Sequence, residues 1–171
     1  MFNAANLLQI FCWHVHVYFL QNNKASIDAA LAIHADFVHR FEVSEIPCAA
    51  EVTVNETCVW GCKTSSTECL NMSPQGPHTF GSVGFSMPNS EYNTIVPWVF
   101  SAFEKFGDRV AGILIHPLTA SRGEDTLISR RRDHELGLWI PERLPIDYDF
   151  LDHNIYDCSV CDMNNCTQAC T

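Results

Sequence analysis

The chain has 171 residues, a length typical of a single domain that can bury a proper hydrophobic core. Its composition, 47% hydrophobic and 18% charged residues, is ordinary for a globular protein and argues against a disordered or fibrous one. The formal net charge of −10 repels phosphates and anionic lipids, so we expect no nucleic acid and no membrane among its partners. The apolar segment from Leu7 to Leu20 alternates in polarity, so we expect neither a membrane span nor a signal peptide there.

The first predicted element is a strand at about residues 11–20, and its two faces differ in chemistry. Its odd positions are all apolar, whereas its even positions hold Cys12, His14, His16 and Tyr18. Because side chains alternate across a strand, one face packs on a core and the other presents two imidazoles. Histidines two positions apart stand about 6–7 Å apart along a strand, so both can reach one ion. A half-buried strand that carries imidazoles without a function is the alternative.

A helix is predicted over about residues 26–41, with Ser26 as its N-cap. Apolar residues recur there at helical spacing, which places His34 near the apolar stripe and His39 beside it. For both histidines, packing in or beside the helix explains the position more simply than metal binding. Pro47 ends this unit and a cysteine-rich insertion of about residues 48–77 follows.

The remaining predicted elements are a strand at 79–87, a helix from Thr94 to Gly107, and strands at 110–116 and 136–140. We assign them to a βαββαβ order, the ferredoxin-like split βαβ pattern of the α+β class. This fold has a four-stranded antiparallel sheet with two helices on one face. In our assignment the first and third strands lie parallel in the centre, with the second and fourth at the edges.

Five of the eight histidines fall at positions that this arrangement brings together: His14, His16, His78, His116 and His134. We expect His116 at the end of the third strand, His78 at the start of the second and His134 at the start of the fourth. Chance would rarely place five imidazoles at one end of a sheet. The pattern therefore predicts a metal site or an acid–base site.

Cysteines are concentrated in two segments with little apolar periodicity: Cys48, Cys58, Cys62 and Cys69 in the insertion, and Cys158, Cys161, Cys166 and Cys170 in the C-terminal tail. Glycosylation sequons at Asn55, Asn71 and Asn165 lie in the same two segments. Both features favour disulfide-bonded surface segments in a secreted or extracellular glycoprotein. A cytoplasmic zinc or redox module is the alternative, since Cys158-x-x-Cys161 has the spacing of metal ligands. The ninth cysteine, Cys12, is the natural candidate for a free thiol.

Four short motifs carry a family resemblance: His14-Val-His-Val-Tyr-Phe19, Gly76-Pro-His78, His116-Pro-Leu-Thr119, and Asp133-His134 followed by Leu138-Trp139-Ile140. In this order they resemble the motifs of the DOPA 4,5-dioxygenase family of extradiol enzymes. The resemblance covers about residues 11–141, so we expect a dioxygenase-like domain at 1–141 and a cysteine-rich extension at 142–171. Ala120 departs from the glycine usual in the third motif, and the insertion and the tail are foreign to the pattern.

The resemblance implies a ferredoxin-like fold that pairs into a dimeric α/β barrel, and a reaction that opens a catechol such as DOPA next to its two hydroxyls. We expect a homodimer in which a second sheet covers the polar face of the first strand, and dioxygen as co-substrate. A secreted metal- or catechol-binding protein of the same fold, without turnover, is the alternative function.

Ring opening of this type needs a metal with exchangeable positions, and imidazoles suit iron(II), with zinc or another divalent ion as the alternative. We expect its ligands to come from His14, His16, His78 and His116. No carboxylate lies inside the motifs, although Glu124, Asp125 and Asp133 are nearby.

Three further residues are candidates for the chemistry around the metal. His134 is the expected acid–base residue, because imidazole titrates close to neutral pH. Tyr18 could hydrogen-bond a bound oxygen or the substrate, and Arg109 could hold a substrate carboxylate. An aromatic residue at an interface and a solvated charge are the respective alternatives.

Overall fold

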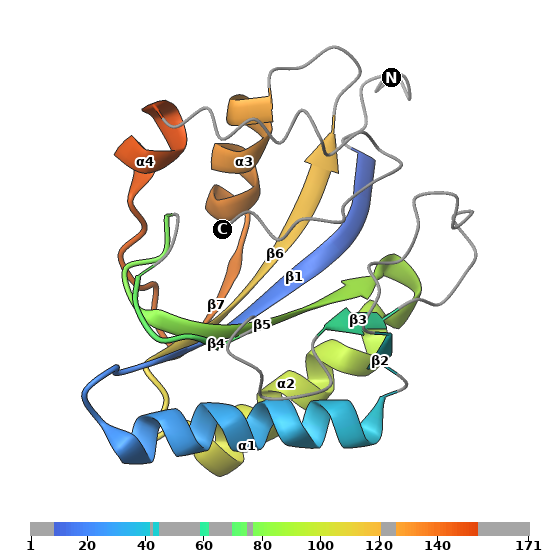
Figure 1. Cartoon of the computed structure of the whole chain (residues 1–171). Coiled ribbons are helices and arrows are strands. Elements are labelled where there is room, and N and C mark those ends of the chain that lie inside the picture. Colours follow the sequence, from blue (N-terminus) through green and yellow to red (C-terminus); the bar gives the residue numbers. More distant parts are fainter. Residues whose placement is uncertain are drawn as a thin grey trace.

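The computed structural model describes residues 9–41, 43–44, 59–61, 70–74, 77–120 and 126–153, which form one sheet with helices on both faces (Figure 1). Its strands are β1 (Gln9–Phe19), β2 (Val43–Ser44), β3 (Val59–Gly61), β4 (Leu70–Asn71), β5 (Gly81–Pro88), β6 (Gly112–Ala120) and β7 (Leu138–Ile140). Its helices are α1 (Lys24–Arg40), α2 (Tyr92–Phe106), α3 (Thr126–Glu135) and α4 (Tyr148–His153), with a 3-10 turn at Asn89–Glu91. Helices α1 and α2 cover one face of the sheet, and α3 and α4 lie on the other (Figure 1).

The predicted ferredoxin-like α+β class is confirmed, but the predicted assignment of strands to it is wrong. The sheet order is β2-β3-β5-β1-β6-β7, and β1 is antiparallel to both β5 and β6. In the observed βαββαβ order the second strand is the short β3, which lies inside the predicted insertion. Strand β5, predicted as the second strand, is the third, and β6, predicted as the third, is the fourth. The predicted parallel central pair does not exist. A three-residue strand in a cysteine-rich segment has too little periodicity for its sequence to reveal it.

The apolar face of β1 packs against α1 and α2, as predicted. Val15, Val17 and Phe19 are at most 1% exposed and belong to one cluster with residues of both helices. The buried stripe of α1 includes Ala30, Ile33 and Phe37. Burial of each such side chain contributes about 1.5–3 kcal/mol, so this layer stabilises the sheet.

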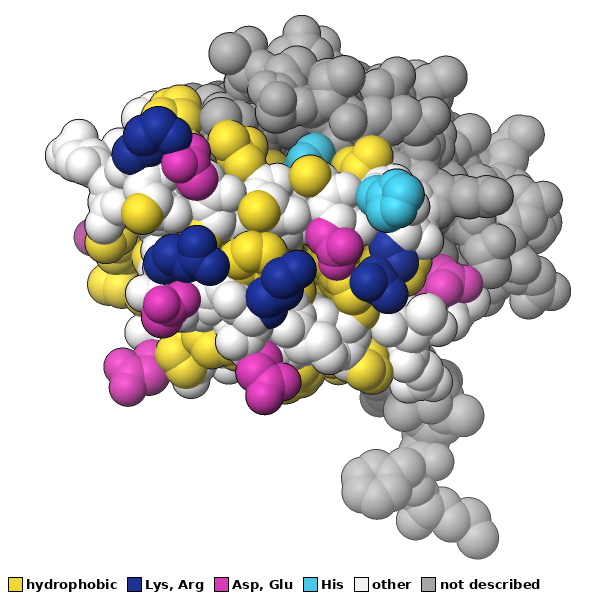
Figure 2. Space-filling model, turned by 90° about the horizontal axis from the view of Figure 1, so that it is seen from below, with side chains coloured by type: hydrophobic (Ala, Val, Ile, Leu, Met, Phe, Trp, Pro, Cys, Tyr) yellow, Lys and Arg dark blue, Asp and Glu magenta, His cyan; other side chains and the backbone are white. Residues whose placement is uncertain are grey.

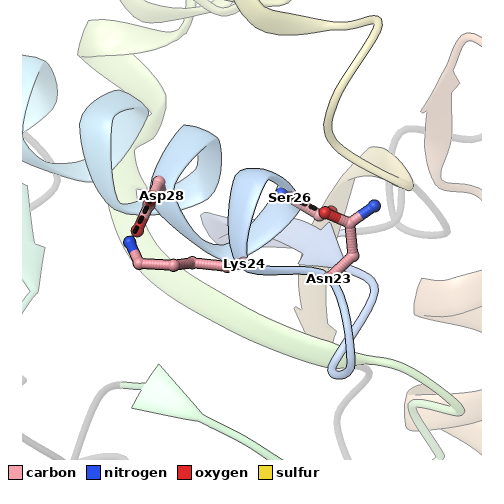
Figure 3. A network of polar contacts seen from close by, with 4 residues as sticks. All are labelled: Asn23, Lys24, Ser26 and Asp28. Carbon is pink, nitrogen blue, oxygen red and sulfur yellow. Dashed lines mark hydrogen bonds and ion pairs between the residues drawn. The ribbon is translucent and has the colours of Figure 1, made fainter.

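Side-chain hydrogen bonds close the connection from β1 to α1, and Figure 3 shows the one between Asn23 and Ser26. The N-cap of α1 is Asn23, whose side-chain oxygen accepts from the Ser26 N–H at 3.2 Å, so the prediction that Ser26 is the cap is wrong. Ser26 instead accepts from the Leu20 N–H through its Oγ at 2.9 Å. This short turn secures the end of β1 that carries Tyr18.

The outer surface of α1 and α2 carries interspersed basic, acidic and apolar side chains (Figure 2). The two helices are joined by a hydrogen bond from Trp98 Nε1 to Asp36 Oδ2 at 2.8 Å. His34 is buried within α1 and His39 is exposed on it, which confirms the predicted structural placement of both. Among the residues that the structure describes, no helix is long and apolar enough to cross a membrane.

Candidate metal and acid–base site

The register of the central strands places the imidazoles on the face of the sheet opposite α1 and α2. His14 of β1 lies directly across from His116 of β6, and His16 lies across from Leu114. Residues that face each other across antiparallel strands project to the same side of the sheet. On the other flank of β1, His14 and His16 lie beside Ser86 and Gly84 of β5, whose small size leaves room for the rings.

Three imidazoles come within reach of one ion. The closest ring nitrogens of His14, His16 and His116 all lie within 4.8 Å of one another. The Nε2 atoms of His16 and His116 are 3.2 Å apart. Two nitrogens that each bind one ion at about 2.1 Å stand roughly 3.0–3.4 Å apart, so this pair already has the spacing of metal ligands. We refer to these residues as the histidine triad.

The backbone sets the tautomer of His116. Its Nδ1 lies 3.0 Å from the carbonyl oxygen of Pro117, which can only accept a hydrogen bond. Nδ1 therefore carries the proton, and the lone pair of His116 is on Nε2, which faces His16. A ligating histidine almost always donates its second ring N–H in this way, so His116 has the orientation of a metal ligand.

His78 joins the cluster beside the triad. Its ring lies 4.3 Å from that of His16, and its Nδ1 is 2.8 Å from the Tyr18 hydroxyl. A β-bridge to Ile146 and a hydrogen bond from the Asp147 N–H to the Pro77 carbonyl hold this segment in place. Within the described residues His78 is not part of the group at metal-ligand spacing, so its predicted ligand role stays a prediction.

His134 reaches the cluster from a different element than predicted. It lies in the last turn of α3, not at the start of a strand, because β7 begins only at Leu138. Its ring stacks on His116 with centroids 4.4 Å apart, and it lies 5.4 Å from the ring of His78. Helix α3 was missed because residues 130–135 are all charged or histidine and lack an apolar stripe. The predicted convergence of five histidines is nevertheless confirmed.

Burial keeps the imidazoles neutral at physiological pH. It lowers the pKa of His14 to about 4 and that of His78 to about 3, and repulsion from His134 adds to both. The pKa values of His16 and His116 are held well below 6.5, first by burial and then by neighbouring imidazoles. Neutral imidazoles offer their lone pairs to a metal without first losing a proton.

The Tyr18 hydroxyl stays protonated in this setting and can donate a hydrogen bond. The side chain is 1% exposed, and burial raises the pKa of its phenol above its usual range. Its ring stacks on the indole of Trp139 at 5.8 Å, with 15° between the planes. A protonated phenol can donate a hydrogen bond to His78 or to a ligand oxygen.

Trp139 lies beside the cluster, although its sequence motif indicated no role for it at the site. It pairs with Leu114, which pairs with His16, so all three lie on the same face of the sheet. Its Nε1 is buried, with no hydrogen-bond partner among the described residues. Trp139 is next to Leu114 on the neighbouring strand, and Leu114 is next to His16. This relation follows from the register of β6 and β7, which the sequence does not show.

Several predicted residues do not join the cluster. The Arg109 guanidinium contacts Asp108 and the ring of Phe106 at the end of α2. The Asp133 carboxylate accepts hydrogen bonds from Thr119. Glu124, Asp125, the eight cysteines of the insertion and tail, and the sequons at Asn55 and Asn165 lie outside the described residues; Asn71 ends β4, and nothing is described of the Cys12 side chain.

The sequence model of the Dopa 4,5-dioxygenase family matches residues 13–150. The chain belongs to this family. A DOPA 4,5-dioxygenase of Amanita muscaria is 33% identical over 136 residues, which cover 79% of this chain and 47% of that protein. The chain thus spans about half the length of this curated relative. The predicted family resemblance is confirmed.

A solved structure supports the fold. A crystal structure from Nostoc punctiforme, described as a candidate dioxygenase, has a TM-score of 0.53 and 24% identity, and covers 84% of this chain and 92% of that chain. At this identity the likeness supports the fold alone. All five clustered histidines lie inside the part of the chain that the Dopa 4,5-dioxygenase family model matches.

Proposed function

We propose that this chain is a metal-dependent extradiol dioxygenase that opens a catechol such as DOPA at a ring bond next to its hydroxyls, with consumption of dioxygen. The observation that carries the proposal is the histidine triad, three neutral imidazoles within 4.8 Å inside a domain of the Dopa 4,5-dioxygenase family. Membership of that family supports the assignment of the chain as a dioxygenase. The extradiol chemistry and the metal are our own inference from the donor set.

His14, His16 and His116 are the residues that would hold the metal, with His78 as a neighbour that could join them. When bound there, iron(II) would supply exchangeable coordination positions and the redox chemistry that dioxygen requires. Imidazole is a suitable donor for it, and the described residues place no carboxylate in the group.

The other side chains handle protons and exclude water. His134, stacked on His116, would accept a proton from a catechol hydroxyl and later return one to the product. The Tyr18 hydroxyl and His78, 2.8 Å apart, form a second polar pair that can orient a substrate oxygen. Helix α3 lies over this face (Figure 1), and His116 and His134 are buried beneath it, which would limit the access of bulk water.

Anaerobic loading with iron(II), followed by addition of L-DOPA and air, tests this function. We expect oxygen uptake matched by a yellow ring-opened product. His16→Gln should lose at least about 100-fold in activity, whereas His39→Gln, on the exposed part of α1, should match the wild type. Metal uptake without oxygen consumption for any catechol would favour the alternative, a metal- or catechol-binding protein without turnover.

We also propose that the protein works as a secreted homodimer. A second copy would cover what α3 and α4 leave open on the imidazole face, and the cysteines and sequons favour an oxidising compartment. Sedimentation of the active protein tests the dimer, and intact mass with and without reductant tests the disulfides. A fully active monomer, or free thiols in protein from an oxidising compartment, would contradict the respective proposal.

A further inference from the structure

We propose that Asp133 is a positioning residue: through Thr119 it holds His134 against the histidine triad. Only the kinetic arm of this inference rests on the proposed function, because the geometry of His134 can be measured without turnover. Among the described residues Asp133 is not part of the group at metal-ligand spacing, so the role that we assign to it is exerted through its neighbour His134.

The Asp133 carboxylate is bound at both oxygens by one residue of β6. The side chain is 3% exposed; its Oδ2 accepts from the Thr119 N–H at 3.0 Å, and its Oδ1 accepts from the Thr119 hydroxyl at 2.5 Å. Arg132 donates from Nη2 to the same hydroxyl oxygen at 2.7 Å. Two bonds to one carboxylate restrict both its position and its rotation.

This bond joins the backbones that carry the two stacked imidazoles. Asp133 directly precedes His134 in α3, and Thr119 lies three residues after His116 on β6. The two rings that these backbones carry are stacked, with centroids 4.4 Å apart and 26° between their planes. A shift of the last turn of α3 would therefore change the distance from His134 to the triad.

The turn that follows His134 is also fixed, by a backbone hydrogen bond and by close packing against the sheet. The Gly137 N–H donates to the His134 carbonyl at 3.3 Å. A Cβ at Gly137 would lie 3.2 Å from that oxygen and 2.4 Å from Cδ1 of the buried Leu114. His134 is thus held from both sides, by a hydrogen bond before it and a close backbone approach after it.

The described residues at this end of α3 offer no apolar side chain that could anchor the helix in place of the hydrogen bonds between Asp133 and Thr119. The helix residues whose side chains are described, 131–135, are all charged or histidine. Arg131 and Glu135 pair with each other at 3.0 Å on the surface. Among these side chains Asp133 and His134 are the buried ones, so the hydrogen bonds that Asp133 accepts from Thr119 form a buried link between this turn and the sheet.

Asp133→Asn and Thr119→Val test the inference, with Thr119→Ser as the conservative variant that keeps the hydroxyl. Asp36→Asn is the matched control, because Asp36 also accepts a side-chain hydrogen bond between elements, from Trp98, but on the opposite face of the sheet. A general loss of stability would affect all the disruptive variants, whereas a positioning role separates Asp133 and Thr119 from Asp36.

The first measurement is NMR of the histidine ring protons in metal-free protein. We expect Asp133→Asn and Thr119→Val to shift or broaden the His134 and His116 signals, since each ring lies in the ring current of the other. Thr119→Ser and Asp36→Asn should leave these signals in place. The second measurement is kinetics of the iron-loaded protein, where the first two variants should lower kcat about 10-fold with KM changed less than about 2-fold and iron content unchanged.

The outcomes separate the two proposals. Unmoved His134 signals and a kcat equal to that of Asp36→Asn would overturn the positioning role and leave the proposed function intact. A wild type without ring-opening activity would overturn the proposed function, and the NMR comparison would still decide the positioning role. If Asp133→Asn does not fold, Thr119→Val and Thr119→Ser decide it, because they differ in the hydroxyl and leave the carboxylate in place.

Discussion

The two faces of the sheet are formed by the same strands but have opposite effects on the stability of the fold. On one face β1 buries Val15 and Val17 against α1 and α2, and this burial stabilises the fold. On the other face the same strand holds His14 and His16 in surroundings that oppose their protonation, which costs stability whenever the imidazoles would otherwise be charged. The comparison indicates that the helix face supplies the stability on which the imidazole face depends.

Lowering the pH should give the largest effect on the free energy of unfolding, because it acts on the imidazole face and not on the helix face. In the metal-free protein the pKa values of His14 and His78 are lowered to about 4 and about 3 from an ordinary 6.5. The unfolded chain therefore binds protons that the folded chain does not, so the stability present above pH 6.5 is lost as the pH falls. The loss is roughly 1.4 kcal/mol per pH unit for each such imidazole.

Urea unfolding between pH 7 and pH 4.5 measures this loss. His14→Gln should reduce the slope with pH, whereas His39→Gln on the exposed part of α1 should not. Equal unfolding midpoints at both pH values would contradict the destabilising character of the imidazole face.

A cavity on the helix face should have the next largest effect. Phe37 is fully buried and its ring lies 3.7 Å from that of Phe85, so Phe37→Ala should lower the free energy of unfolding by about 3–5 kcal/mol. The histidine signals of the remaining folded protein should stay unchanged, because the sheet separates the cavity from the rings. Phe100→Ala, at a position 48% exposed on α2, is the control and should cost less than about 1 kcal/mol. A shift of the His14 signal in Phe37→Ala would show that the faces are coupled.

The same comparison explains which features the sequence could predict. The alternation in β1 identified both faces and the two imidazoles at 14 and 16, because period-2 patterns are local. The predicted order of elements placed His78, His116 and His134 beside them, but it assigned His134 to the start of a strand and not to α3. Helix α3 is held at its end by a hydrogen bond between Asp133 and Thr119, a contact distant in sequence that leaves no periodic pattern. The pairing of β3 with β5 is likewise a contact between segments distant in sequence, and β3 is too short to show a periodic pattern.

The smallest effect should come from a methyl group on the imidazole face. Gly137→Ala would place its Cβ 2.4 Å from Leu114 Cδ1 and 3.2 Å from the His134 carbonyl oxygen. Leu114 is fully buried and cannot move freely, so we expect a loss of about 1–3 kcal/mol and a displaced His134 ring.

Leu114→Ala added to Gly137→Ala should return the His134 NMR signal toward its wild-type position, because it removes the closest clashing atom. Gly84→Ala is the control on the same face: its Cβ would meet the Val15 carbonyl oxygen at 3.4 Å and His16 Nδ1 at 3.5 Å, so its cost should be smaller. If Gly137→Ala and Gly84→Ala proved equally tolerated, with the His134 signal unmoved in both, the close approach of the α3–β7 turn to the sheet would not be what sets the stacking of His134 on His116.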